Sequence, residues 1–375
     1  MNAKRLDAII DMLPSAGIPM ADLLVTRNGE TVYRHSSGYT DKEGKRPTSP
    51  RDIYWIYSNT KIATCIAAAR LLEEGRLSLT DRLDRYIPAF RDVTVRQADG
   101  TTAPPKSPIT IEHLFTMSAG LDYNCAAPAI TEAAAAGGDT QAIVRAIAKS
   151  PLHFEPGSTF RYSLCHDVLA AVCEVVTDLT FSEYLQKVML DPLEMKDTGF
   201  RPTEEQKTRF AAMYNHDGGT MSAIPRPCEN GFALTPAYDS GGAGLFSTTE
   251  DYAKLVTAIA LGGTAKNGYR LLSPETIRLF ATNRITDEGR RGLCNGRLYG
   301  YGWGLCGRVH MDPRVSLSAS PRGEFGWDGA AGGLNMMDPV SGTALYLSTH
   351  VHCSSYLYTK VHPAIINAVY ERVES

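Results

Sequence analysis

The sequence predicts an α+β fold, an α/β sandwich in which an antiparallel sheet with flanking helices is joined to a mainly helical lobe. Strand patterns occur near the start of the chain and again near its end, whereas helical patterns dominate residues 77–234. We therefore expect a discontinuous sheet lobe of residues 1–76 and 235–375, and a helical lobe of residues 77–234. A cleft between two such lobes is a natural place for an active site.

The composition indicates a globular protein rather than a nucleic-acid or membrane binder. The chain has 375 residues, 43% of them hydrophobic, which is enough to bury a sizeable core. A net charge of -3 and the lack of a long basic run argue against nucleic acid or an anionic membrane as partner. Asp7 and Asp11 interrupt the apolar residues of 1–14, so we expect a surface helix there, no secretory signal and a cytoplasmic location.

The first expected elements are a hairpin and a helix. Asn28-Gly29 suits the positive φ angles of a two-residue turn, so residues 22–27 and 30–35 should pair as antiparallel strands. Apolar residues recur at helical spacing from 59 to 74, and Gly75 is a suitable C-cap. This helix places Ser58 at its N-terminus.

Helix signals follow through the middle of the chain. Thr110 and Asp139 should cap helices over 111–117 and 140–149, and residues 164–176 are strongly periodic. Ser247-Thr248-Thr249-Glu250 has the capping-box pattern, and Ser273-Pro274 is typical of another helix start. Strand patterns are scarce before residue 235.

Glycine-rich strand patterns then follow at 298–309, 323–329, 333–337 and 343–351. Residues 338–342 should join the last two strands as a hairpin, and a helix over 355–373 should close the chain. The eight cysteines include no Cys-x-x-Cys pair, so we expect most of them to be reduced thiols.

Ser58-Asn59-Thr60-Lys61 is the strongest candidate for a nucleophilic site. A serine hydroxyl needs a neighbouring base at neutral pH, and Lys61 lies one helical turn away on the same face. Burial and the positive end of the helix disfavour an ammonium, so we expect a lowered pKa that lets Lys61 act as base or proton relay. The motif is short, however, and an ordinary surface serine and lysine have the same spacing.

Four further segments make the chain resemble the β-lactamase-like serine hydrolases, which include class C β-lactamases, D-alanyl-D-alanine carboxypeptidases of the penicillin-binding-protein type and esterases. Residues 154–163, FEPGSTFRYS, resemble the segment that carries the family's catalytic tyrosine. Residues 191–198, DPLEMKDT, and 241–248, GGAGLFST, resemble structural strings of the family. Residues 325–333, FGWDGAAGG, stand where the strand beside the active site is expected.

The resemblance implies a β-lactamase/transpeptidase-like fold and a role for each matching residue. Ser58 would be the acylated nucleophile, Lys61 and Tyr162 would share the proton transfers, and the backbone N–H groups of Ser58 and Ala330 would form the oxyanion hole. Which group is the base stays open, since a lysine ammonium favours the anionic form of a nearby phenol. This chemistry needs no cofactor, and His166 is expected to be a packed or solvated histidine.

Two departures from the lactamase pattern carry information on the substrate. Leu164 replaces the usual asparagine and offers no hydrogen bond, and Trp327-Asp328-Gly329 replaces the usual Lys-Thr-Gly. Asp328 would repel an anionic substrate unless Arg161 or Arg322 restores positive charge. At Gly329 the missing side chain would let the substrate approach closely. We expect these four positions, Leu164 and 327–329, to contact the substrate.

The resulting hypothesis is a carboxylesterase that acts on small neutral esters through an acyl-enzyme on Ser58, with esters, amides or lactams as its small-molecule partners. The alternative is a β-lactamase, D-alanyl-D-alanine carboxypeptidase or D-aminopeptidase, and a lesser one is a binding or sensor module without turnover. A metal at His350-Val351-His352-Cys353 is weaker, because no fourth ligand is visible. The oligomeric state is not predicted.

Overall fold

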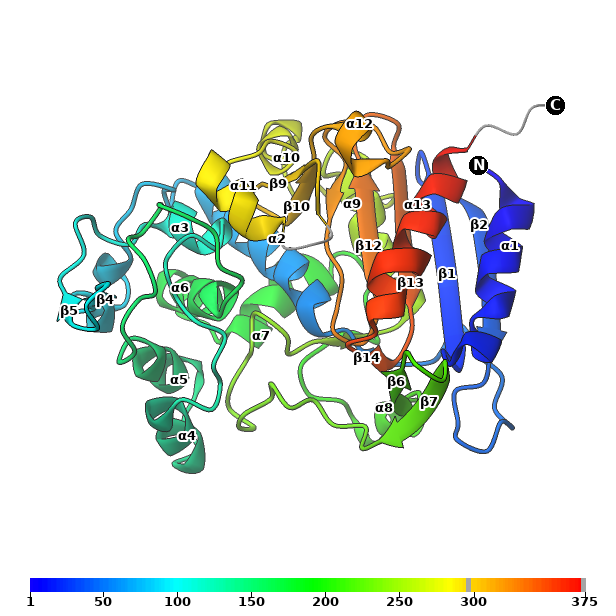
Figure 1. Ribbon diagram of the computed structural model, residues 1–375, viewed down its shortest axis with the longest axis horizontal. Coiled ribbons are helices and arrows are strands. Elements are labelled where there is room, and N and C mark those ends of the chain that lie inside the picture. Colours follow the sequence, from blue (N-terminus) through cyan, green and yellow to red (C-terminus); the bar gives the residue numbers. More distant parts are fainter. Residues whose placement is uncertain (295–297, 372–375) are drawn as a thin grey trace.

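The chain is organised around one large antiparallel sheet, shown in a computed structural model that describes residues 1–294 and 298–371 (Figure 1). The sheet has seven strands in the order β2-β1-β13-β12-β11-β10-β9. Strands β1 (Met20–Arg27) and β2 (Glu30–Gly38) form the predicted hairpin, and Asn28 and Gly29 turn it with φ angles of 50° and 83°. Both residues therefore adopt the left-handed conformation that this turn requires.

The late strands complete this sheet and confirm the predicted α+β class. They are β9 (Tyr301–Trp303), β10 (Arg308–His310), β11 (Phe325–Gly326), β12 (Leu334–Asp338) and β13 (Thr343–Ser348). β1 pairs with β13 along its length, from Asp22 opposite Ser348 to Arg27 opposite Thr343. Early and late parts of the chain thus meet in the centre of one sheet.

Helices cover both faces of the sheet, as the alternation of β1 shows. Leu23 and Val25 pack in a cluster with residues of α1 (Ala3–Met12) and α13 (His362–Tyr370). Leu24 points the other way, into a cluster with residues of α2 (Thr60–Glu73) and α9 (Thr249–Ala260). Because successive strand residues face opposite sides, α1 and α13 lie on one face and α9 on the other, as Figure 1 also shows.

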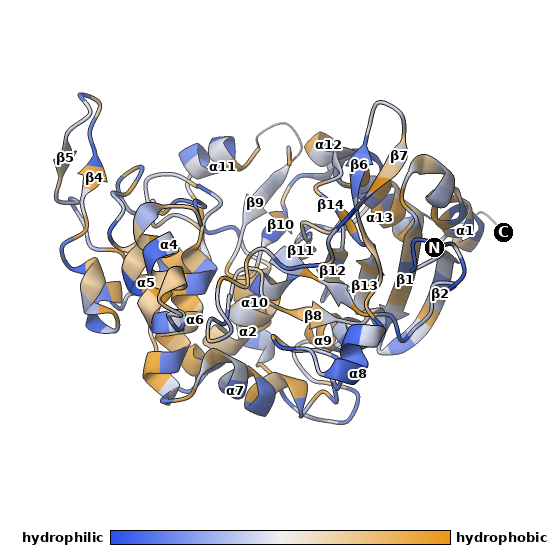
Figure 2. Cartoon of the chain, turned by 90° about the horizontal axis from the view of Figure 1, so that it is seen from below, coloured by the Kyte–Doolittle hydropathy of each residue, from blue (hydrophilic) through white to orange (hydrophobic). Residues whose placement is uncertain are grey.

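The middle of the chain is mainly helical and packs beside α2. Its helices are α3 (Ile111–Phe115), α4 (Pro128–Ala135), α5 (Thr140–Ile147), α6 (Cys165–Thr177), α7 (Phe181–Leu185) and α8 (Glu204–Thr208). Figure 2 shows hydrophobic residues along α2 and α6 and hydrophilic residues on α8, in line with the buried α2 and α6 and the solvent-facing α8. The two-lobe division stays a prediction.

Four short strands also lie in this stretch, where strand patterns are scarce. β4 (Val95–Arg96) pairs with β5 (Thr102–Ala103), and β6 (Met213–Asp217) pairs with β7 (Ser222–Arg226). β6 also pairs in parallel with β14 (Val351–His352), a pairing that no local sequence pattern predicts. A further pair, β3 (Tyr54–Trp55) with β8 (Phe246–Ser247), lies next to Ser58.

The helix starts follow the predicted caps with one shift. Thr110, Asp139 and Ser273 each accept a hydrogen bond from the backbone N–H three residues on. Before α9 the cap is Thr248, bonded to the N–H of Asp251, and not Ser247 as the capping-box pattern suggested. α10 (Pro274–Phe280), α11 (Asp287–Leu293) and α12 (Pro313–Ser316) follow, and a turn at Leu357–Val361 leads into α13. The predicted end of the last helix at 373 lies outside the described residues.

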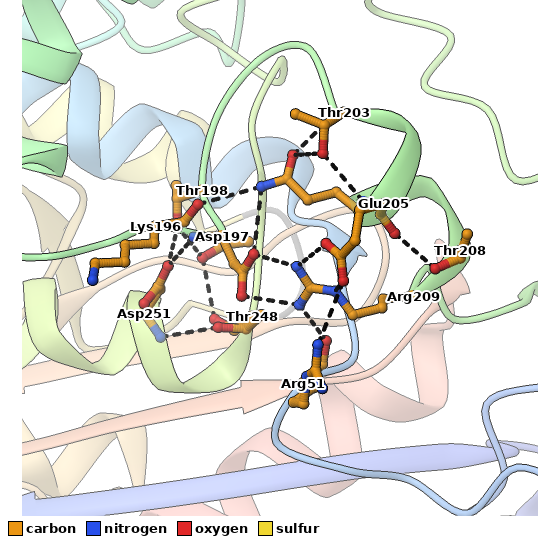
Figure 3. A network of polar contacts seen from close by, with 12 residues as sticks. Arg51, Lys196, Asp197, Thr198, Thr203, Glu205, Thr208, Arg209, Thr248 and Asp251 are labelled. Carbon is orange, nitrogen blue, oxygen red and sulfur yellow. Dashed lines mark hydrogen bonds and ion pairs between the residues drawn. The ribbon is translucent and has the colours of Figure 1, made fainter.

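A polar network fixes the segment before α8 against the start of α9 (Figure 3). The Arg209 guanidinium bonds both carboxylate oxygens of Asp197 and the backbone carbonyl of Arg51, and it lowers the pKa of Asp197. The backbone N–H of Asp197 donates to Asp251 at 2.6 Å. Thr198 and Ser247 share a hydrogen bond of 2.7 Å, so the strings 191–198 and 241–248 lie side by side.

The cysteines are free thiols, and His350 hydrogen-bonds the backbone. All eight cysteines lie in the described part of the chain, and each is a free thiol. Both ring nitrogens of buried His350 bond backbone: Nε2 accepts from Trp55 N–H at 3.1 Å, and Nδ1 donates to the Ala211 carbonyl at 2.9 Å. Within residues 1–294 and 298–371, no group of three or more potential ligands could hold a metal, and no helix is long and apolar enough to cross a membrane.

We expect His350 to make the protein sensitive to acid. Burial lowers the pKa of His350 from 6.5 to about 4. The unfolded imidazole titrates near 6.5, so the neutral His350 stabilises the folded protein fully above that pH. This stabilisation is lost as the pH falls toward 4, which lowers the free energy of unfolding by about 3 kcal/mol in all. Urea unfolding at several pH values should show a slope of about one proton in this window. His350→Gln should remove that slope and the half-buried control His352→Gln should keep most of it; an unchanged slope in His350→Gln would contradict the assignment.

Candidate active site

Ser58 lies in a tight turn that feeds directly into a helix. The turn, Tyr57–Asn59, is a single 3-10 turn, and α2 begins at Thr60. Tyr57 has a φ of 45°, which a bulky residue rarely adopts, and strained backbone of this kind gathers at functional sites. Ser58 is 8% exposed and opens into a cavity of about 500 Å³. The lining includes six positions that the sequence singled out: Ser58, Arg161, Tyr162, Trp327, Asp328 and Ala330.

Lys61 is buried beside Ser58 as a fully bonded ammonium. Its Nζ donates to Ser58 Oγ at 3.1 Å, to Tyr123 Oη at 3.2 Å and to the Gly242 carbonyl at 2.7 Å. These bonds use all three protons of an ammonium. Burial disfavours its charge, but Tyr123, Tyr162 and Asp167 outweigh that effect and hold the pKa of Lys61 above its ordinary value. The expected lowering of this pKa is therefore wrong, because burial alone does not decide it.

Tyr162 lies next to Lys61 in a cluster of aromatic rings. The Lys61 Nζ lies 4.7 Å from the centre of its ring. Its hydroxyl oxygen accepts a hydrogen bond of 2.9 Å from the Trp327 indole N–H. A cation over the ring and a donor at the oxygen both stabilise negative charge on a phenol oxygen. The structure thus brings Ser58 and Tyr162 to one cavity, with Lys61 buried beside both of them.

Tyr123 completes this group, and the sequence did not point to it. Its ring stacks on that of Tyr162, with centres 5.5 Å apart and planes 2° apart. Its segment is fixed by Asp122, which accepts the Tyr123 N–H at 2.8 Å and the Arg161 guanidinium at 2.9 Å. Tyr123 lies in a loop, where neither periodicity nor spacing distinguishes one tyrosine from another. Only the fold places it at Lys61.

The peptide between Gly329 and Ala330 is held in a defined orientation. The Gly329 carbonyl accepts a hydrogen bond of 3.0 Å from the Tyr358 hydroxyl, and the Ala330 carbonyl accepts one of 2.6 Å from the Cys353 N–H. In a trans peptide the N–H of Ala330 points opposite to the Gly329 carbonyl, away from Tyr358. Two anchored carbonyls therefore fix the direction of the Ala330 N–H at the cavity.

An asparagine pair joins this strand to the turn at Ser58. Asn335 accepts the Trp327 N–H at 3.0 Å and donates to Asn59 Oδ1 at 2.6 Å. A Cβ at Gly329 would lie 2.3 Å from the Ile56 carbonyl oxygen and 2.9 Å from Asn59 Nδ2. The close approach that requires glycine is thus made by the protein's own backbone. Our expectation that Gly329 makes room for the substrate needs this correction.

Leu164 and Arg322 are not where the sequence placed them. Leu164 is buried and lines a separate small cavity with Leu121 and His153, so it is not brought to Ser58. It directly precedes α6, and its side chain serves the core. Arg322 is exposed and faces Asp312, outside the lining of the Ser58 cavity. Among the described lining residues the one arginine or lysine is Arg161, which is paired with Asp122.

This chain is similar to known proteins over nearly its whole length. Residues 6–352 match the protein family described as Beta-lactamase. Esterase EstB of Burkholderia gladioli is 31% identical over 93% of this chain and 90% of its own length. A putative D-alanyl-D-alanine carboxypeptidase of Escherichia coli K12 is 28% identical over 93% and 82%. The solved structure of EstCE1, a hydrolase with promiscuous acyltransferase activity, is 27% identical, covers 98% of both chains and has a TM-score of 0.83.

Proposed function

The chain belongs to the beta-lactamase family, and on that premise we propose that it is a serine esterase that forms an acyl-enzyme on Ser58. The observation that carries the proposal is the contact of Ser58 Oγ with Lys61, at 3.1 Å, in a cavity that Tyr162 also lines. Similarity to an esterase over nearly the whole chain supports the reaction type.

In the proposed acylation, Tyr162 reacts as the phenolate, its own proton having passed to solvent, and accepts the proton of Ser58 while Ser58 Oγ attacks the ester carbonyl carbon. Lys61 is better suited to stabilise charge than to accept this proton, because its three N–H bonds are already used. The oxyanion of the tetrahedral intermediate would bind the N–H groups of Ser58 and Ala330. Its collapse breaks the ester C–O bond, and the proton held at Tyr162 passes to the departing alcohol.

Deacylation repeats these steps with water in place of serine. Tyr162 would accept a proton from water, the hydroxide oxygen would attack the acyl carbon, and Ser58 would leave with the proton returned to its Oγ. Trp327 supports both stages, because its indole N–H donates to the Tyr162 oxygen and stabilises the phenolate that acts as base. Lys61 provides a fixed positive charge throughout.

The surroundings of the cavity support a small neutral substrate. Trp327 lines it where a lactamase would offer a lysine, Asp328 next to it adds a carboxylate, and the cation Arg161 is already neutralised by Asp122. Phe160, Leu293 and Leu298 offer apolar contacts for an acyl or alcohol group. Residues from the sheet side, such as Ala330, and from the helical side, such as Phe160, both contribute. This supports our proposal that the site lies between two lobes.

We expect the protein to prefer esters strongly over lactams. The kcat/KM for p-nitrophenyl acetate or butyrate should exceed that for a chromogenic cephalosporin by at least about 100-fold, since no unpaired lining cation within the described residues would bind the lactam carboxylate. Steady-state rates on both substrates test this. Ready cephalosporin turnover with poor ester turnover would favour the lactamase alternative, and release of D-alanine from a D-alanyl-D-alanine peptide would favour a carboxypeptidase like the Escherichia coli relative.

A further inference from the structure

Asp167 is a buried carboxylate that the proposed reaction does not use. It lies in the first turn of α6, five residues after Tyr162, and is fully buried. Its Oδ1 accepts hydrogen bonds from the Tyr238 hydroxyl at 2.6 Å, the Ser240 hydroxyl at 2.7 Å and the Gly242 N–H at 3.2 Å. Its Oδ2 has no hydrogen-bond partner among the described residues. A buried acid of this kind needs a compensating charge or a proton.

The hydrogen bonds indicate that Asp167 carries a charge. Ser240 Oγ accepts the Ala243 N–H at 3.1 Å, so its own proton is directed to Asp167. Three donors on one oxygen stabilise a carboxylate, and the N-terminal end of α6 adds to this. The anion is therefore the better-satisfied form.

The backbone of Gly242 bonds both Asp167 and Lys61. Its N–H donates to Asp167, and its carbonyl accepts the Lys61 ammonium at 2.7 Å. A Cβ at Gly242 would lie 2.4 Å from Asp167 Oδ2, so only glycine lets the carboxylate approach this closely. The glycine string 241–244 is thus arranged to bring an anion and a cation to opposite sides of one residue.

Tyr123 and two nearby thiols keep their protons at neutral pH and so do not supply a negative charge to Lys61. The groups that interact with it are Tyr123, Tyr162, Asp167 and the thiols of Cys125 and Cys165. Burial raises the pKa of both thiols to about 12 and raises the pKa of Tyr123. Before Tyr162 gives up its proton, Asp167 is the remaining anion among these described groups.

We propose that Asp167 is the buried counter-ion of Lys61, a positioning residue that keeps the lysine charged and oriented through the Gly242 peptide. In the resting enzyme it balances the ammonium, so that Lys61 stabilises negative charge on Tyr162 and does not compete with it as a base. The structural part stands on the contacts alone, and the kinetic part rests on the proposed function.

A double-mutant cycle in stability tests the pairing without any need for activity. Asp167→Asn, Lys61→Met and the double variant are compared by thermal unfolding of the full chain. Each single variant leaves a buried charge uncompensated. The decrease in Tm of the double variant should therefore be smaller than the summed decreases of the two single variants, by at least about 3 °C. Additive losses would overturn the proposal. If Asp167→Asn alone does not fold, the double variant must fold for the proposal to stand.

The pH profile of ester hydrolysis is the second test. In Asp167→Asn the alkaline limb of kcat/KM should move to lower pH by about one unit or more, because Lys61 loses its counter-ion. The matched control Tyr238→Phe removes a hydrogen bond to Asp167 and keeps the charge, so its limb should stay near that of the wild type. An unmoved limb in Asp167→Asn would overturn the kinetic role. Failure of the stability cycle refutes only this proposal, whereas an unreactive Ser58 refutes the proposed function.

Discussion

Replacing Ser58 with alanine is expected to lower kcat for ester hydrolysis by at least about 10⁴-fold. The hydroxyl is the only group that forms the proposed covalent bond, and neither Lys61 nor Tyr162 can take its place as an acylated residue that water then releases. The loss should appear in kcat and in the pre-steady-state burst of alcohol release with substrate in excess. Both are measured with p-nitrophenyl butyrate.

The same substitution should leave the fold intact. Within residues 1–294 and 298–371 the Ser58 hydroxyl donates no recorded hydrogen bond, and its oxygen serves as one of three acceptors for Lys61. Thermal unfolding should therefore change little. Ser118→Ala is the matched control, because Ser118 is buried to a similar degree but lies outside the cavity lining. Retention of substantial turnover by Ser58→Ala would mean that another residue is the nucleophile.

Tyr162→Phe should be the second most damaging change, with kcat reduced by about 10²–10⁴-fold. Phenylalanine preserves the ring over Lys61 and its contacts with Trp327, so the loss would report the hydroxyl alone. It also leaves the Trp327 indole N–H without the acceptor that it has at 2.9 Å. Proton transfer from Ser58 and from water would both be slowed, so acylation and deacylation should fall together.

Tyr123→Phe provides the comparison within the same stacked pair. Tyr123 accepts one of three hydrogen bonds from Lys61, whereas the Trp327 indole donates to Tyr162, so kcat should fall by only about 10-fold. Rates for both variants across pH 6 to 10 separate the two roles. If Tyr123→Phe were the more damaging, the base would be Tyr123 and the mechanism would have to be redrawn around it.

Local sequence patterns were sufficient wherever a structure depends on neighbouring residues. Asn28-Gly29 predicted the hairpin because two positive φ angles suffice to define its turn, and the periodicity after Ser58 predicted α2. Lys61 followed from its spacing to Ser58 on one helix. Tyr162 and Ala330 came only from the resemblance, since nothing local relates them to Ser58. In the structure Ser58, Tyr162 and Ala330 line one cavity, and Lys61 bonds Ser58 next to it.

Features that depend on long-range packing were missed or wrong. Tyr123 and Asp167 reach Lys61 through loops and glycines far apart in the chain, and they reverse the expected direction of its pKa. Leu164 follows Tyr162 by two residues, yet the turn before α6 directs it into the core. Gly329 is required by Ile56, 273 positions earlier, rather than by a substrate. The spacing of neighbouring residues carries no information about contacts between positions so far apart in the sequence.

The central claim is covalent reaction at Ser58, and labelling with a fluorophosphonate probe tests it most directly. Trypsin releases residues 52–61 as one peptide, in which Ser58 is the single serine. Mass spectrometry should find one label per chain on this peptide in the wild type, and no label in Ser58→Ala. Labelling that persists in Ser58→Ala, or that maps to another peptide, would contradict the account.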